Sequence, residues 1–360
     1  MKPPKRPCRY ANRCLNPGYR ILVLALVLAC GSTAASESFV NFEGARASAE
    51  TVIASQEGAN PQLEKLLSPG LWERIRSGFA VPDLDTKIVA SQIAWFAARP
   101  EHLQAIALRA RPYLHFIVNE VERRGLPTEL ALLPFIESGF NPMALSSARA
   151  SGLWQFIPET GTRYKLAQTS LYDGRRDVVA STGAALDYLQ FLHAFNRGDW
   201  QRALASYNWG ESAVARAVER NKSRGLAESY DSLTMPDETR NYVPRLLAIK
   251  RIIADPAAYG LQLPEIANEP VFEVVKFQHD LELRLAAQFA GIPLEEFLIL
   301  NPAFNSKHVP GSTGAALAIP LERSEAFKIN LERHQASLAR QDGARAAERK
   351  ASKVASGTRF

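Results

Sequence analysis

A single glutamate in this sequence stands in a setting suited to proton transfer. A helix is predicted over residues 127–139, opened by Pro-Thr and closed by Gly, and Glu137 lies in its last turn, where the helix dipole is negative. Its neighbours Phe135, Ile136 and Phe140 are apolar and would desolvate the carboxylate. Both effects disfavour the anion and raise the pKa of the carboxyl group. Glu137 is therefore predicted to hold a proton near neutral pH and to deliver it to a leaving oxygen.

Two other residues of this helix carry structural expectations. Pro134 stands inside the helical pattern and should kink the helix. Glu129 lies in the first turn, where a helix favours negative charge, which predicts a structural role. On its own, a glutamate such as Glu137 is more often a surface or ion-paired residue, because structural ion pairs also perturb carboxyl groups. Its assignment therefore depends on the elements and motifs around it.

The chain up to residue 270 is predicted to be helical. From residue 37 to about 124, apolar residues recur at three- and four-residue steps, as in Trp72, Ile75 and Phe79. Proline and glycine residues separate the segments. The last helix of this stretch is predicted over 111–124, with a proline near its start.

The pattern changes in the last quarter of the chain. A strand is predicted over 271–277, a helix over 281–290, a second helix over 293–301 and a strand over 315–319. This β-α-α-β order indicates a small separate module. Beyond Pro320 the chain is rich in Arg, Ala and Ser with little apolar content, which predicts a frayed helix or a disordered tail.

The N-terminus has the features of an export signal. The first twenty residues hold six basic groups and no acid, and an apolar run follows over residues 21–29. A membrane span needs about 20 apolar residues, so residues 1–30 are predicted to be a signal peptide. Residues 27–30 resemble the lipobox of bacterial lipoproteins, which would place a lipid on Cys30. Cleavage after Ala34 or Ala35 is the alternative.

The composition argues against several other classes of function. With 46% hydrophobic and 22% charged residues among 360, the chain can fold into two or three domains. Residues 21–322 hold 28 basic and 33 acidic side chains, so this body lacks the positive surface that nucleic-acid binding requires. All three cysteines lie in the leader, and the six histidines lack metal-ligand spacing. Neither a metal site nor a cofactor is predicted.

Segments downstream of Glu137 strengthen its assignment. They are residues 144–161, with Ser146 and a Gly-Leu-Trp-Gln motif, residues 205–210, with Tyr207-Asn208, and residues 238–245, with Tyr242. Together with the Glu137 segment and residues 71–76, 111–114, 122–127 and 173–177, they resemble the lytic transglycosylase family of bacterial peptidoglycan enzymes, specifically its D type.

The resemblance implies a mainly helical protein with a goose-type, lysozyme-like catalytic domain. It implies a helical N-terminal region over 37–120, the catalytic SLT domain over 121–262, a LysM-like module over 271–321 and a basic tail over 322–360. The module is degenerate, because it lacks the Gly and Thr of the usual Gly-Asp-Thr-Leu motif. Whether it binds glycan or is only a structural appendage stays open. The implied partners are peptidoglycan glycan strands and, through a lipid on Cys30, the outer membrane of an exported, periplasmic protein.

The resemblance also implies roles for individual residues. Glu137 matches the single catalytic acid/base of the family, and Ser146 matches a serine near that carboxyl or the substrate N-acetyl group. Gln155 matches a glutamine that lines the sugar cleft, and Tyr207-Asn208 match a pair beside the acid.

Other positions carry a structural alternative. Tyr242 lies in the motif that closes the cleft, whereas Trp154 and Phe156 could be ordinary core aromatics. Trp209 replaces a small residue of many relatives and is expected to alter packing more than chemistry.

The implied reaction cleaves the β-1,4 bond between N-acetylmuramic acid and N-acetylglucosamine. Most glycosidases need two carboxyl groups, but no second acid in a comparable apolar setting lies near Glu137 in the sequence. A lytic transglycosylase needs only one, and its product is a 1,6-anhydro sugar. Two alternatives remain, a goose-type lysozyme that hydrolyses the same bond and a wall-binding lipoprotein without catalysis.

Overall fold

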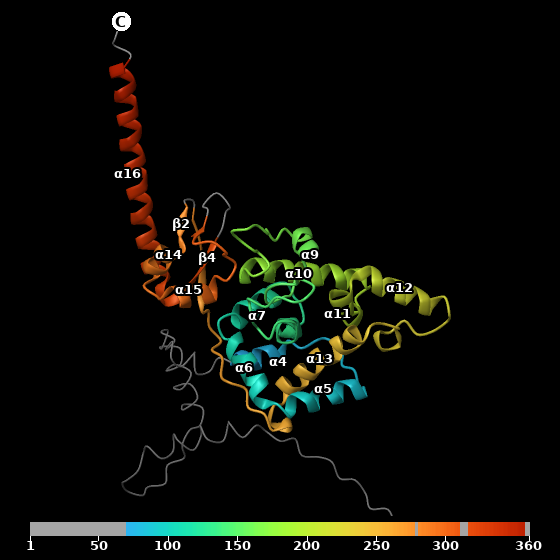
Figure 1. Cartoon of the computed structure of the whole chain (residues 1–360). Coiled ribbons are helices and arrows are strands. Elements are labelled where there is room, and N and C mark those ends of the chain that lie inside the picture. The colour runs from blue at the N-terminus through green and yellow to red at the C-terminus, as the bar shows by residue number, and fades with distance from the viewer. Residues whose placement is uncertain (1–69, 278–279, 310–315, 357–360) are drawn as a thin grey trace, which may run out of the picture. The chain divides into compact units, whose positions relative to one another are not determined.

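The computed structural model describes residues 70–277, 280–309 and 316–356, with side chains described up to residue 349 (Figure 1). The predicted signal peptide and Cys30, with its alternative cleavage sites, lie outside these residues. The described chain is mainly helical, and its strands are confined to the C-terminal module. This confirms the predicted fold class.

Four α-helices precede the segment that carries Glu137 in the described chain: α4 (Leu71–Ser77), α5 (Lys87–Ala97), α6 (Pro100–Ala110) and α7 (Leu114–Arg123). The Thr86 side chain caps α5 by accepting a hydrogen bond from a backbone N–H of the first turn. Pro100 opens α6, where its missing N–H costs no helical hydrogen bond.

The segment that carries Glu137 differs from the prediction. It is a 3-10 helix, η1 (Thr128–Leu132), followed by a five-residue α-helix, α8 (Leu133–Glu137). The predicted kink of one continuous helix at Pro134 is therefore wrong. Pro134 stands in the first turn of α8, a position that needs no backbone donor. Glu137 is the last residue of α8.

Glu129 has the structural role predicted for it, although its partners come from other elements. Its side chain is fully buried. The backbone N–H groups of Ala80 and Val81 donate to its two carboxylate oxygens at 3.0 and 2.9 Å. Lys250 Nζ lies 3.0 Å from Glu129 Oε1. The buried charge is thus compensated by a cation and two donors, as a buried carboxylate requires.

Five further α-helices complete the main helical part. They are α9 (Pro158–Arg163), α10 (Val178–Phe195), α11 (Trp200–Trp209), α12 (Glu211–Lys222) and α13 (Asp237–Ala254), with short 3-10 turns η2 (Tyr230–Ser232) and η3 (Ala257–Tyr259). The side chains of Asp177 and Asp199 cap α10 and α11. Helix α13 packs against α5, α11 and η1, and α10 packs against α11 (Figure 1). This packing places α13 beside the Glu137 segment.

The C-terminal module follows the predicted β-α-α-β order with one addition. Strand β1 (Phe272–Lys276) pairs antiparallel with β4 (Ala316–Pro320), and α14 (Leu283–Ala290) and α15 (Leu294–Leu300) lie between them in sequence. A second antiparallel pair, β2 (Leu281–Glu282) with β3 (His308–Val309), was not predicted. Two-residue strands are too short to leave a periodic pattern.

The region predicted to be a frayed helix or a disordered tail contains a long helix, α16 (Ser324–Ser356), preceded by the 3-10 turn η5 (Leu321–Arg323), so the helical alternative holds for its described residues. Phe327 and Leu331 are buried in the core of the module, and Asn330 Nδ2 donates to the Phe289 carbonyl at 3.0 Å. The module therefore continues past residue 321. Figure 1 shows α16 extending well beyond the rest of the module.

Replacing Glu129 with alanine should strongly destabilise the fold. The substitution removes the partner of Lys250 and of two backbone donors, and an uncompensated buried charge costs about 3–5 kcal/mol in the free energy of unfolding. Urea unfolding followed by circular dichroism measures this. Glu120→Ala, which removes partly exposed ion pairs with Arg123 and Arg124, is the control and should lose far less, because Arg124 keeps Asp187 as a partner. Equal losses in the two variants would contradict a structural role specific to Glu129.

Candidate active site

The residues predicted to form the site line one cavity of about 500 Å³. The cavity lies among the end of α8, the loop over residues 144–157, and helices α9, α10, α11 and α13. The predicted residues on its wall are Glu137, Ser146, Gln155, Tyr207, Asn208 and Tyr242. The structure thus brings six side chains together from four separate segments of the chain.

Opposing effects set the pKa of the Glu137 carboxyl group close to neutral pH. The Tyr242 hydroxyl donates a hydrogen bond to Glu137 Oε1. Burial raises the pKa of Glu137 to about 7, because the ionised carboxylate loses its hydration. The Tyr242 hydrogen bond and the charge of Arg245 lower this pKa, whereas the charge of Glu238 raises it. The predicted upward shift is present, and burial is its main cause.

A tight turn after α8 fixes the position of Glu137. Gly139 and Phe140 both have positive φ angles, of 57° and 55°. The Phe140 N–H donates to the Pro134 carbonyl at 3.0 Å, and the Phe140 ring is fully buried against Phe135, with ring centroids 5.0 Å apart. Left-handed backbone is unfavourable for a bulky residue. The buried aromatic packing offsets this strain and ends the helix directly after Glu137.

The loop over residues 144–157 forms the wall that carries Ser146 and Gln155. The Ser146 hydroxyl oxygen accepts a hydrogen bond from the Ala150 N–H at 3.0 Å. Gln155 has a positive φ of 50°, and its amide nitrogen donates to the carbonyls of Gly152 and Ala144 at 2.8 and 3.3 Å. Both side chains therefore hold the loop in shape as well as lining the cavity.

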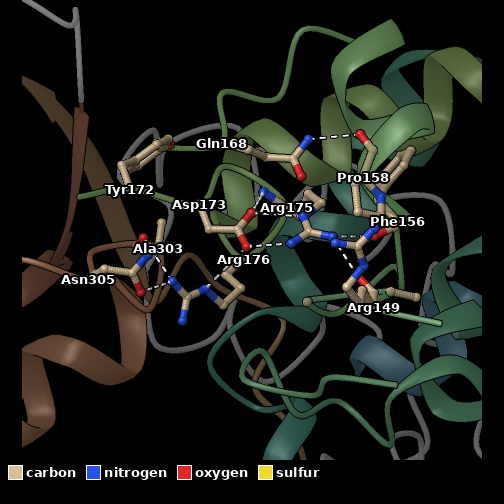
Figure 2. A network of polar contacts seen from close by, with 12 residues as sticks. Arg149, Phe156, Pro158, Gln168, Tyr172, Asp173, Arg175, Arg176, Ala303 and Asn305 are labelled. Carbon is tan, nitrogen blue, oxygen red and sulfur yellow. Dashed lines mark hydrogen bonds and ion pairs between the residues drawn. The ribbon is translucent and has the colours of Figure 1, made fainter. Parts of the chain in front are cut away.

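A buried arginine, which is not part of the cavity lining, supports the same loop by binding its backbone (Figure 2). Arg175 Nη1 donates to the carbonyls of Arg149 and Phe156 at 2.7 and 3.2 Å, and Asp173 accepts two hydrogen bonds from Arg175 at 2.9 and 2.8 Å. A Cβ atom at Gly152 would lie only 1.9 Å from the Arg175 carbonyl oxygen, so only glycine fits there. Sequence analysis placed Asp173 and Arg175 in a family segment but gave them no function.

Tyr207 and Asn208 contact the cavity from the end of α11. The Tyr207 hydroxyl donates to the Trp154 carbonyl at 2.8 Å. Asn208 bridges to the start of α13, because its side-chain oxygen accepts from Thr239 at 2.8 Å and its nitrogen donates to Glu238 at 3.2 Å. The pair predicted to lie beside the acid is thus also part of the connection between α11 and α13.

Glu238 is a cavity residue that sequence reasoning did not single out. It is exposed, lines the cavity and acts electrostatically on Glu137. It lies in the family segment over residues 238–245, in which only Tyr242 was given a role. The signal available in the sequence was its place four residues before Tyr242, one turn earlier on the same helix.

The remaining aromatic residues divide between core and cavity. Trp154 is fully buried, and its indole N–H donates to Thr182 at 3.0 Å. It is a core residue, which was the structural alternative. Phe156 is also buried but contributes to the cavity wall. Trp209, which was expected to affect packing, is half-buried, packs against the core and also lines the cavity.

Comparison with known families matches two parts of the chain. The model of the transglycosylase SLT domain matches residues 115–229. The model of the LysM-like domain of lytic transglycosylase MltD matches residues 271–336. The first match includes Glu137, and Tyr242 lies between the two matched ranges.

Comparison with individual proteins agrees. The chain is 35% identical over 261 residues to membrane-bound lytic murein transglycosylase D of Escherichia coli K12, covering 72% of this chain and 58% of that protein. It is 45% identical over 137 residues to a putative tributyltin chloride resistance protein of an Alteromonas species, covering 38% and 62% respectively.

A more distant relative is membrane-bound lytic murein transglycosylase C of Haemophilus influenzae strain PittGG. It is 28% identical over 174 residues, which cover 42% of this chain and 48% of the relative. The matched regions thus span less than two thirds of each of these relatives. Both domain models match in order, and the D-type relative aligns with 72% of this chain at 35% identity, so the matched parts of the chain belong to the lytic transglycosylase family.

Proposed function

We propose that this protein cleaves the β-1,4 bond between N-acetylmuramic acid and N-acetylglucosamine in peptidoglycan and leaves 1,6-anhydro ends. The observation that carries the proposal is the Glu137 carboxyl group, which lies in a cavity, accepts a hydrogen bond from Tyr242 and has a pKa of about 7. Such a group is close to half-protonated at neutral pH, so it can serve both as an acid and as a base. Two relatives named as lytic murein transglycosylases support the same activity.

The reaction needs one proton to be delivered and one to be recovered. Protonated Glu137 gives its proton to the glycosidic oxygen as the bond to C1 breaks. The substrate's own N-acetyl oxygen stabilises the positive charge that develops at C1. The Glu137 carboxylate then takes the proton of the C6 hydroxyl as that oxygen bonds to C1. No water is consumed, and the carboxyl group ends in its starting form.

The other cavity residues have supporting roles in this proposal. Tyr242 stabilises the Glu137 carboxylate after the first proton transfer, because its hydrogen bond favours the ionised form. Ser146, Gln155, Tyr207 and Asn208 contact the sugar units on either side of the bond. Their hydroxyl and amide groups suit the hydroxyls and acetamides of the glycan.

Hydrolysis is the alternative, and Glu238 is the observation that bears on it. A carboxylate in the same cavity is what a lysozyme would need to activate water. However, Glu238 is exposed and accepts a hydrogen bond from Asn208, which favours the single-acid reaction over hydrolysis. A protein that only binds the cell wall, without catalysis, would have no use for the costly desolvation of Glu137. We therefore favour the single-acid reaction.

The names of the relatives and the predicted leader support a proposal for the location of the protein. The described chain contains no helix with the length and apolar character of a membrane span. Two relatives are named as membrane-bound. We propose that a lipid on Cys30 supplies the membrane association of this exported protein and holds it at the periplasmic face of the outer membrane.

Glu137→Gln should lower turnover on purified sacculi by at least ~10²–10⁴-fold, the usual effect of losing a general acid/base. Glu159→Gln, an exposed glutamate in the first turn of α9 outside the cavity wall, is the matched control and should keep full activity. Mass spectrometry of the wild-type products tests the reaction type, because hydrolysis adds one water to each cut and anhydro formation adds none. Near-native turnover of Glu137→Gln, or hydrated products from the wild type, would overturn the proposal.

The pH dependence of turnover should report the Glu137 carboxyl group. Because the acid must be protonated for the first step, kcat/KM should fall as the pH rises through about 7. Tyr242→Phe removes a hydrogen bond that lowers this pKa, so the falling limb should move to higher pH. Tyr230→Phe, which loses a buried hydroxyl bonded to the Thr239 carbonyl, is the control and should leave the limb in place. If the fall of kcat/KM moved to lower pH in Tyr242→Phe, the group that titrates would not be the carboxyl group to which Tyr242 donates its hydrogen bond.

Glu238→Gln distinguishes an electrostatic neighbour from a second catalytic carboxylate. If Glu238 only raises the pKa of Glu137, the variant should keep activity within about threefold at pH 5–6, and its falling limb should move to lower pH. If Glu238 activates water, activity should drop by ~10²–10⁴-fold at every pH. Glutamine retains an oxygen for the Asn208 hydrogen bond, so the local geometry is preserved.

A further inference from the structure

A second cavity, of about 390 Å³, adjoins the catalytic cavity. Its wall includes Gln92 and Trp95 of α5, His102 of α6, and Ile136 and Arg245. Ile136 and Arg245 also line the catalytic cavity, so the two hollows share a wall beside Glu137. The residues from α5 and α6 precede residue 115, where the SLT family match begins. This cavity is therefore completed by helices outside the matched catalytic domain.

The distinctive residue of this second cavity is Trp95. Its side chain is 43% exposed. Its ring is nevertheless held in place, with Phe96 and His102 edge-on at 4.9 and 5.4 Å and the Arg99 guanidinium 4.6 Å from the ring centroid. The Arg99 guanidinium covers one face of the ring, and the remaining exposed part of the indole at the cavity wall offers an apolar surface that needs no ordering on binding.

The polar groups of the cavity suit the same kind of ligand. Gln92 donates from its amide nitrogen to Asn241 at 3.3 Å, which orients the amide. The exposed His102 ring and the half-buried Arg245 guanidinium add further groups at the wall. A flat apolar surface beside amide, imidazole and guanidinium groups matches a sugar ring, which has an apolar C–H face and hydroxyl and acetamide substituents at its edge.

We propose that this cavity is a binding subsite for a further sugar unit of the glycan strand whose bond is cut at Glu137. The inference rests on the proposed function, because the strand must pass through the catalytic cavity to reach it. Trp95 stacks against the sugar ring, and Gln92, His102 and Arg245 contact its polar groups. The N-terminal helices thereby set how long a glycan must be to bind fully.

Binding of glycans of defined length to Glu137→Gln tests this without turnover. The probes are peptide-free peptidoglycan fragments of two, four, six and eight sugars, measured by isothermal titration calorimetry. Affinity should rise at the length that first reaches the second cavity. Adding Trp95→Ala should weaken binding of the longer fragments about fivefold to tenfold and leave the shortest unchanged. Trp95→Phe should recover part of the loss.

Two controls keep the result interpretable. Leu108→Ala truncates an exposed apolar residue of α6 that lies outside both cavities, and it should bind every fragment as the parent does. Thermal unfolding checks that the Trp95 variants are folded. The same length dependence with and without Trp95 would overturn the subsite.

A second set of probes, fragments that retain their peptide stems, separates sugar from peptide. A Trp95-dependent gain confined to these fragments would assign the cavity to the peptide and overturn the sugar assignment. If no fragment binds any variant, the proposed substrate itself is wrong. That outcome differs from a loss confined to the Trp95 variants, so the two proposals fail in distinguishable ways.

Discussion

The hydrogen bond from Tyr242 to Glu137 is the contact on which the candidate active site depends. Burial favours the protonated acid and this hydrogen bond favours the anion, so their balance leaves the pKa of the carboxyl group close to neutral pH. The bond joins α8 to α13, and a second contact joins the same two stretches, since Glu129 of η1 pairs with Lys250 of α13. Glu129 and Glu137 are eight residues apart, and so are Tyr242 and Lys250, and the two stretches pair in antiparallel order. The buried ion pair thus fixes the register in which Tyr242 meets Glu137.

The opposite wall of the cavity depends on a different kind of support. The loop over residues 144–157 has little regular structure, and its strand-like contacts are isolated bridges. Arg175 compensates by binding two of its carbonyl groups, and Asp173 in turn fixes the guanidinium. Arg175 and Asp173 are not part of the cavity lining, so they support the loop that carries Ser146 and Gln155 through its backbone and without contacting the cavity. A loop held in this way can present polar side chains to a sugar without a helix or a sheet beneath it.

The raised pKa of Glu137 could be predicted because its signal is local: three apolar neighbours indicate desolvation of the carboxylate. The interpretation of Glu137 as the acid depended in addition on the family motifs around it. The donor on Tyr242 could not be paired with Glu137 from physical reasoning alone, because it lies 105 residues away and only the packing of α13 brings it there. The kink at Pro134 was wrong for a related reason, since the pattern does not distinguish one bent helix from a 3-10 turn followed by a new helix. The C-terminal tail was predicted only as a frayed helix or a disordered segment, because its polar composition does not show that two buried residues, Phe327 and Leu331, anchor it to the module.

The C-terminal module forms hydrogen bonds with the segment of the catalytic part that supports the cavity wall. The Asp173 N–H donates to the Ala303 carbonyl and the Asn305 N–H donates to the Leu171 carbonyl, both at 2.8 Å, and Arg176 donates to the Asn305 side chain (Figure 2). Removing the module would therefore strip partners from the loop that carries Arg175. A loss of activity or of wall binding after such a deletion would not separate glycan binding by the module from mechanical support of the site. Substitutions on exposed faces of α14 and α15 leave these contacts intact, so they address the binding role alone.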